Sequence, residues 1–232
     1  MFSKKNLLGV GLTDENIKDV LEYIETNLQK AQKKCYIVTP NPEILVIASK
    51  DVRYKKVLNN ADLALIDGVG ILIAGKVMGV DFQNRITGVG LLENVCKRTA
   101  EKPITVGFLG GRPGVAEKAS ECLKRKYPGL KVAFAKEEMP ILASDILFVA
   151  FGSPKQEFWI AENLQKLPVK VVVGVGGAFD MISGEVSRAP LWVRKIGFEW
   201  LFRLIIQPWR LKRQLRLLVF IFLVAKEKIS HL

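Results

Sequence analysis

Histidine is almost missing from this chain, because the single histidine among its 232 residues is His231, next to the last position. Ser-His-Asp and Cys-His catalysis both need a histidine base, and most zinc enzymes use histidine ligands. The sequence therefore argues against these three kinds of site. If the protein is an enzyme, its general base is expected to be a carboxylate.

Cysteine is also scarce. Cys35, Cys96 and Cys122 are odd in number, lie far apart and contain no C-x-x-C pair. Such a set is typical of a reducing compartment and argues against structural zinc. The chain does not open with a cationic start and an apolar core of about 7 to 15 residues, so we recognise no signal peptide. We expect a cytoplasmic protein.

Long apolar runs are absent from the C-terminal segment. Its longest uncharged run, Leu217 to Ala225, has nine residues. A membrane-spanning helix needs about 20 apolar residues. The segment is therefore predicted not to span a bilayer.

Common nucleotide-binding motifs are missing as well. There is no G-x-G-x-x-G, which argues against a nicotinamide or flavin dehydrogenase. Gly70 to Val77 matches the spacing of a P-loop up to Lys76, but Val77 stands where a Ser or Thr must hold Mg²⁺. There is also no D-x-D pair, the metal-diphosphate signature of many sugar-nucleotide enzymes. We therefore expect no metal site and no cofactor.

Positive charge is abundant and local. The chain carries a net charge of +12, and residues 188–232 contribute ten Lys or Arg against two Glu. Arg210, Arg213 and Arg216 recur at helical spacing, while a second face of the same helix carries Leu and Phe. The members of that apolar face are Leu211, Leu215, Leu218 and Phe222. This pattern is typical of a helix that lies on an anionic membrane surface.

A C-terminal helix that packs its apolar face on the body and solvates its arginines is the alternative. The amount of apolar surface favours the membrane, because one docking stripe does not need so many large side chains. The apolar residues in question are Phe198, Trp200, Leu201, Phe202, Leu204, Ile205, Ile206 and Trp209.

Up to residue 180, short β-branched runs alternate with helical patterns. The expected strands are Cys35–Thr39, Leu63–Ile66, Ile104–Leu109, Lys131–Phe134, Ile146–Phe151 and Val171–Val175. The expected helices are Asp14–Ala31, Pro42–Lys50, Val52–Leu58, Val69–Met78, Gly88–Ala100, Pro113–Tyr127 and Pro154–Leu167. Strands without polar alternation indicate a parallel sheet that is covered on both faces. We predict an α/β, Rossmann-like catalytic domain at 1–190 and a basic helical appendage at 191–232.

Glycines and polar residues follow the predicted strands at five places: Thr39–Pro42, Asp67–Gly68, Gly107–Gly114, Gly152–Glu157 and Gly174–Asp180. Ligands of open α/β sheets bind at the carboxyl ends of the strands, where glycines let backbone amides approach a phosphate. Each cluster alone could be a turn. Together they predict a nucleotide ligand.

Asp67 is the predicted base, because it follows an apolar strand and precedes Gly68. A cap for the following helix is the alternative role of Asp67, since Asp is a favoured N-cap. Arg85 could clamp a diphosphate or be a surface residue. Thr39, Asn41 and Gln156 could bind sugar or nucleotide, or belong to ordinary turns.

Seven motifs in this order resemble the WecG/TagA/CpsF glycosyltransferases, glycosyltransferase family 26, and most closely their TagA branch. They are Thr39–Glu43, Ile66–Gly70, Arg85–Gly88, Phe108–Gly111, Gly152–Glu157, Gly174–Asp180 and Arg188–Pro190. The resemblance covers nearly the whole chain. Residues 133–145 are shorter than the helix-bearing insert expected in relatives.

The resemblance implies a UDP-sugar donor and an acceptor sugar on undecaprenyl diphosphate, at the inner face of the bacterial cell membrane. For the TagA branch it implies inverting transfer of N-acetylmannosamine to the 4-hydroxyl of N-acetylglucosamine, in the synthesis of the wall teichoic acid linkage unit. Other donors within the family, such as UDP-N-acetylmannosaminuronic acid or UDP-glucose, stay open. The sequence also leaves a homo-oligomer open.

The resemblance further implies site residues. By motif, Asp67 corresponds to the base, and Thr39, Arg85 and Gln156 to catalytic-site residues. The expected substrate-binding residues are Asn41, Gly110, Gly111, Gly176, Asp180, Arg203, Arg210 and Arg213, with the three arginines placed to meet a diphosphate. Arginines and helix N-termini would then take the place of Mg²⁺, so transfer is expected to be independent of metal.

Two other classes compete with this interpretation. A nucleic-acid-binding module would use the net charge of +12 on phosphates. Against this module, the basic residues alternate with Leu, Ile and Phe, so we expect no nucleic-acid partner. A nucleotide-dependent oxidoreductase would share the fold but lacks the dinucleotide fingerprint.

Overall fold

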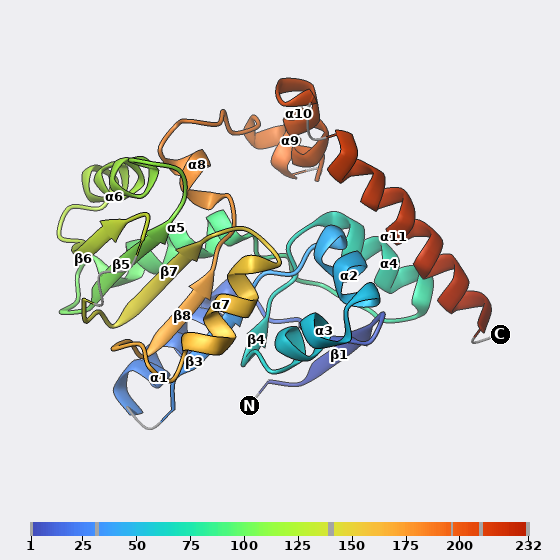
Figure 1. The fold of residues 1–232 in the computed structure, drawn as a ribbon, viewed down its shortest axis with the longest axis horizontal. Helices are drawn as coiled ribbons and strands as arrows, with labels where there is room; N and C mark the ends of the chain where they lie inside the picture. Colours follow the sequence, from blue (N-terminus) through green and yellow to red (C-terminus); the bar gives the residue numbers. More distant parts are fainter. Residues whose placement is uncertain (1, 31–32, 139–141, 196, 209–210, 231–232) are drawn as a thin grey trace.

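A parallel sheet forms the centre of the computed structural model, which describes residues 2–30, 33–138, 142–195, 197–208 and 211–230. Its strands are β3 (Cys35–Val38), β4 (Leu63–Ala64), β5 (Thr105–Gly110), β6 (Lys131–Lys136), β7 (Ile146–Ala150) and β8 (Val171–Gly174). Their spatial order is β4-β3-β8-β7-β5-β6, and every neighbouring pair is parallel. The predicted α/β class is confirmed (Figure 1).

Helices cover both faces of the sheet. One face carries α1 (Ile17–Lys30), α5 (Gly88–Thr99), α6 (Val115–Lys126) and α8 (Ala178–Ile182). The opposite side carries α2 (Pro42–Lys50), α3 (Val52–Asn59), α4 (Val69–Met78) and α7 (Lys155–Asn163).

Strand β3 illustrates why the strands lack polar residues. Tyr36 and Val38 point into the hydrophobic cluster under α2 and α3, and Cys35 and Ile37 point into the cluster under α1 and α5. All four side chains are buried. A strand that is covered on both faces has no solvent side for a polar residue to occupy, as predicted.

An N-terminal hairpin that sequence analysis did not predict precedes these elements. Strands β1 (Lys4–Leu7) and β2 (Val10–Thr13) are antiparallel and are joined through Leu8 and Gly9, which have φ values of 54° and 79°. Two-residue hairpin turns usually carry Asn-Gly or Asp-Gly at these positions. The turn was missed because Leu8 stands where Asn or Asp is expected.

Local signals set some helix ends, and tertiary contacts set others. Helices α2 and α4 have the predicted bounds. At the start of α2, the Asn41 side chain accepts a hydrogen bond from the Ile44 N–H (3.0 Å). At the end of α4, Gly79 adopts the left-handed conformation with φ 78°. Helix α1 was predicted to start at Asp14 but begins at Ile17. The Asp14 carboxylate instead accepts hydrogen bonds from the backbone N–H groups of residues 83 and 84, at 3.0 and 2.8 Å.

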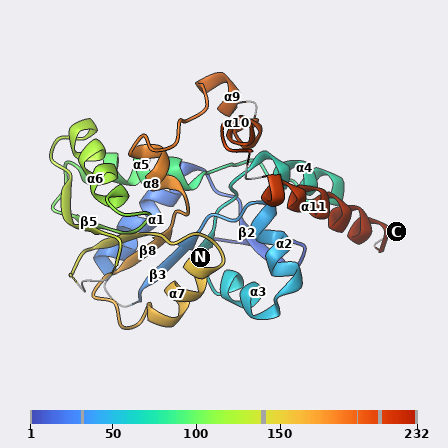
Figure 2. The same ribbon diagram turned by 45° about the horizontal axis from the view of Figure 1, so that its top comes forward.

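The C-terminal segment forms α9 (Leu191–Lys195), α10 (Glu199–Ile206) and α11 (Leu211–Ser230). Helix α11 lies across α2 and α4, where Phe220 and Val224 are buried in the cluster on that side of the sheet (Figures 1 and 2). Arg216 also pairs with Glu43 of α2. For this stripe of α11, the alternative of a helix packed on the body is correct.

The apolar stripe that sequence analysis placed on α11 is a different one. Leu211, Leu215, Leu218 and Phe222 are all more than half exposed. Helix α11 is therefore apolar on two faces, of which one is docked and one is open. Within the described ranges, no helix is long and apolar enough to cross a bilayer.

Candidate active site

Four predicted site residues meet where β3, β4 and β8 end. Thr39 follows β3, Asp67 follows β4, and Gly176 follows β8 in the same parallel sheet. Arg85 approaches from the segment before α5. The adjacent carboxyl ends of parallel strands thus gather polar groups that are far apart in the sequence.

Asp67 is held at this edge by its backbone and by one carboxylate contact. Its N–H donates to the Pro40 carbonyl (2.8 Å), and its Oδ2 accepts from the Gly88 N–H at the start of α5 (3.3 Å). Helix α4 is capped by Gly68 without a side-chain hydrogen bond. The alternative role of Asp67 as the cap of α4 is therefore wrong.

The pKa of Asp67 is raised to about 6, chiefly because burial disfavours the charged carboxylate. The Gly88 N–H and the charges of Arg85 and Arg203 oppose this rise in pKa, while Glu199 adds to it. The residue keeps part of its surface open to solvent. A carboxylate with such a pKa is mostly ionised at pH 7 and can still accept a proton, as a general base must.

Thr39 and Gly88 pack closely together. The Thr39 hydroxyl donates to the Gly174 carbonyl (3.4 Å). A Cβ atom added to Gly88 would lie 3.2 Å from Thr39 Oγ1 and 3.1 Å from the Val175 carbonyl oxygen. Glycine at position 88 thus lets the N-terminus of α5 approach the ends of β3 and β8, where the positive end of the helix dipole favours an anion.

Arg85 is positioned by the segment around it. Asp14 binds the two preceding N–H groups, and the Ile86 N–H donates to the Ile66 carbonyl (2.9 Å). Arg85 is half-buried, and its charge lowers the pKa of Asp67. The predicted arginine therefore lies near the predicted base.

Gln156 belongs to a buried polar network. Its Oε1 accepts from the Gly176 N–H (2.9 Å), and its Nε2 donates to Glu157 Oε1 (2.8 Å). The amide fills the space beside Gly174, where an added Cβ atom would lie 2.5 Å from Gln156 Nε2. Gln156 is 2% exposed, so it holds the loop after β8 from the protein interior.

Glu157 ends the Gly152–Glu157 motif, but sequence analysis gave this residue no role of its own. It is 1% exposed and accepts hydrogen bonds from Tyr54 Oη (2.9 Å), Ser153 Oγ (2.9 Å) and Gln156 Nε2 (2.8 Å). Burial raises the pKa of Glu157, and these donors oppose the rise. Its neighbour in this network, Tyr54, lies more than one hundred positions away in the sequence, so only the tertiary structure identifies the contact.

We predict that Glu157→Ala lowers the free energy of unfolding by about 3 kcal/mol, because three buried donors lose their acceptor. Glu157→Gln is expected to cost less than half as much, since its amide oxygen can still accept. Urea unfolding followed by circular dichroism would measure both. A loss below about 1 kcal/mol in the alanine variant would contradict the role of Glu157 in holding Gln156.

Helix α10 brings the C-terminal segment to the same place. Arg203 and Glu199, four residues apart on α10, both act on the pKa of Asp67. A Cβ atom added to Gly177 would lie 3.7 Å from Arg203 Nη2 and 3.7 Å from Asp180 Oδ2. The predicted residues Arg203 and Asp180 thus both lie next to Gly177 in the loop after β8.

The remaining predicted residues extend along the sheet edge or take structural roles. Gly110 and Gly111 end β5, with positive φ values of 101° and 89°, and Gly111 packs near Phe179 of α8. Asp180 accepts from Arg112 (3.3 Å). The Asn41 oxygen is used by the cap of α2.

Two predicted arginines are not placed. Arg210 lies outside the described residues, and so does the side chain of Arg213. Among the described residues, no group of three His, Cys, Asp or Glu side chains is arranged to hold a metal ion.

A parallel α/β sheet with a carboxylate, arginines and helix N-termini at its carboxyl edge has the architecture of an α/β enzyme that acts on an anionic ligand. The family model for the glycosyl transferase WecG/TagA/CpsF family matches residues 5–232. The chain belongs to this family, which confirms the resemblance.

Named relatives are similar over nearly the whole chain. A protein of Bacillus spizizenii (strain ATCC 23059 / NRRL B-14472 / W23) is 33% identical over 93% of this chain and 88% of its own length. One of Bacillus subtilis (strain 168) is 30% identical over the same shares, and one of Staphylococcus aureus (strain MRSA252) is 29% identical over 97% and 94%. Each is named N-acetylglucosaminyldiphosphoundecaprenol N-acetyl-beta-D-mannosaminyltransferase.

Proposed function

We propose that this protein transfers N-acetylmannosamine from UDP-N-acetylmannosamine to the 4-hydroxyl of N-acetylglucosamine on undecaprenyl diphosphate, in wall teichoic acid linkage-unit synthesis. The names of the relatives support the acceptor and the transferred sugar. The observation that carries the proposal is Asp67, a carboxylate with a pKa of about 6 beside Arg85 and Arg203 at the sheet edge.

In the proposed reaction, Asp67 accepts the proton of the acceptor hydroxyl while that oxygen bonds to the anomeric carbon. The bond from the anomeric carbon to the UDP oxygen breaks, and its electron pair leaves with the diphosphate. Attack opposite the leaving group inverts the anomeric configuration. Arg85, Arg203 and the N-terminus of α5 are suited to stabilise the departing negative charge.

Metal independence is part of the proposal, because arginines lie near the base and the sequence has no D-x-D pair. We expect full transfer activity after treatment with EDTA, measured as product formed per minute with and without the chelator. Restoration of a lost activity by added Mg²⁺ or Mn²⁺ would contradict this expectation.

We also propose that the enzyme acts as a peripheral protein on the cytoplasmic face of the membrane. An acceptor with a polyprenyl chain is confined to the bilayer, so the active site must reach its surface. The open apolar stripe on α11 and the excess of basic residues after position 187 suit an anionic lipid surface.

The test is transfer to N-acetylglucosamine on a short-chain polyprenyl diphosphate, with product identified by mass spectrometry. UDP-N-acetylmannosamine is the expected donor, and UDP-N-acetylmannosaminuronic acid and UDP-glucose are the alternatives to compare. Product from one of these instead would correct the sugar. No product from any donor would overturn the proposed reaction.

A further inference from the structure

Helix α4 carries an apolar stripe that the proposed reaction does not use. Ile73 is 59% exposed and Val77 is 46% exposed, four residues apart on one face, and Lys76 is exposed beside them. The opposite face of α4 is buried through Ile71, Ala74 and Gly75. Residues four apart on a helix form a continuous strip, so Ile73 and Val77 make one apolar surface.

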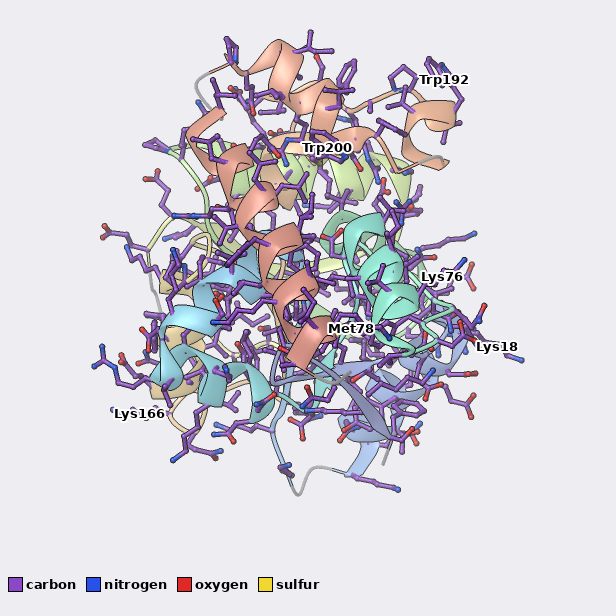
Figure 3. All side chains as sticks on the ribbon, turned by 90° about the vertical axis from the view of Figure 1, so that its right-hand side faces the viewer. Lys18, Lys76, Met78, Lys166, Trp192 and Trp200 are labelled. Atoms are coloured by element: carbon purple, nitrogen blue, oxygen red, sulfur yellow. The ribbon has the colours of Figure 1, made fainter. Side chains whose placement is uncertain are left out.

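Helix α4, which carries this strip, lies beside α11, which carries the open stripe. Helices α4 and α11 contact each other and share one side of the molecule, with Trp192 and Trp200 at the end of that side (Figure 3). Among the exposed large hydrophobic residues of the described chain, all but Val52 and Leu142 lie on α4 or between 191 and 230. Such concentration on one side marks an interaction surface.

The charge of this side favours a lipid partner over a second copy of the chain. Residues 188–232 carry ten basic and two acidic residues, and Lys76 adds a further positive charge from α4. Two copies packed face to face would bring these excess positive charges together. An anionic bilayer instead attracts them and also accepts apolar side chains. Exposed tryptophans at the end of the surface fit the headgroup region.

We propose that Ile73 and Val77 insert into the lipid surface beside α11, so that α4 of the catalytic body is itself a membrane contact. This inference rests on the proposed lipid-linked acceptor. It extends the membrane surface beyond the C-terminal appendage, into an element that belongs to the sheet-and-helix body.

The position of α4 gives the contact a consequence for catalysis. Asp67 and the cap Gly68 directly precede α4. The C-terminal segment closely approaches the first turn of α4, since a Cβ atom added to Gly197 would lie 2.7 Å from the Val69 side chain. Helix α4 thus connects lipid contact at Ile73 and Val77 to the base at its N-terminus. Insertion would hold Asp67 at a set distance from the headgroups, where a lipid-linked sugar can reach it.

The test compares the full-length protein with Ile73→Ser/Val77→Ser in sedimentation with vesicles of phosphatidylglycerol and phosphatidylcholine. The double variant is expected to bind vesicles about tenfold or more weakly, because two apolar side chains no longer enter lipid. Val52→Ser is the matched control, since Val52 is 80% exposed on α3, outside this surface. It is expected to bind vesicles like the unchanged protein.

Transfer to a water-soluble acceptor with a short lipid chain separates this inference from the proposed function. The double variant is expected to keep that activity and to lose transfer to acceptor embedded in vesicles. The inference would be overturned if the double variant and Val52→Ser bound vesicles equally well. It would also be overturned if the double substitution changed only the self-association of the protein, measured by sedimentation velocity. Failure of the unchanged protein to transfer sugar would overturn the reaction and leave the vesicle result standing.

Discussion

Asp67→Asn is expected to lower transfer by about 10²-fold or more, because asparagine cannot take the proton of the acceptor hydroxyl. For the unchanged protein, kcat/KM should rise with pH through about 6, the pKa of Asp67, and level off above it. Initial rates from pH 5 to 8 with a short-chain acceptor would measure both effects. Asp81→Asn, in an exposed loop, is the matched control and should retain activity.

The same substitution is expected to make the protein more stable. Burial raises the pKa of Asp67 from 3.8 to about 6, so its stabilising contribution is complete below about pH 4 and is lost as the pH rises through 6. Replacing the ionised group by a neutral amide should therefore raise the free energy of unfolding at pH 7 by about 2 kcal/mol.

Two outcomes would contradict the role of Asp67 as base. One is an Asp67→Asn variant with activity near that of the unchanged protein. The other is a fall of kcat/KM at low pH whose midpoint lies far from pH 6 and does not change in Asp67→Glu. Urea unfolding at pH 4.5 and pH 7 would test the stability prediction separately, since the gain should be smaller at the lower pH.

Deleting residues 194–232 is expected to abolish transfer and to weaken vesicle binding. The deletion removes Arg203 and Glu199, which act on the pKa of Asp67, and it removes the open stripe of α11. Loss of transfer should extend to a water-soluble acceptor, because the missing groups belong to the site and not only to the membrane contact. Full activity of the shortened protein would contradict this prediction.

The deletion also carries a structural cost that a substitution avoids. Phe220 and Val224 are buried against the body, so their removal should lower the free energy of unfolding by about 3 kcal/mol. Arg203→Gln in the full chain is therefore the sharper variant. It should retain fold and vesicle binding and lose transfer by 10-fold or more, about the effect of one charged contact at a developing charge. Arg125→Gln, at an exposed position of α6, is its control and should keep transfer activity.

Much of the fold could be predicted from local patterns. Helix α2 has its predicted bounds because Asn41 and Pro42 are strong start signals, and α4 ends as predicted at a glycine in the left-handed region. The hairpin of β1 and β2 could not be predicted in this way, since Leu8 occupies a turn position that favours Asn or Asp. Strand β4 ends at Ala64, two residues earlier than predicted, and the next residue, Leu65, forms an isolated parallel bridge with Thr13 of β2.

Composition and motif order by themselves determined the α/β class, the family and the basic apolar tail, and they predicted a carboxylate base, because these depend on residue types and on spacing along the chain. Only the tertiary structure decided which groups surround Asp67, that Glu157 hydrogen-bonds Gln156 in the protein interior, and that α4 lies beside α11. These features join residues far apart in sequence. Packing of the chain decides which side chains are buried. It buries the Asp67 carboxyl, which raises its pKa, and it leaves Ile73 and Val77 exposed.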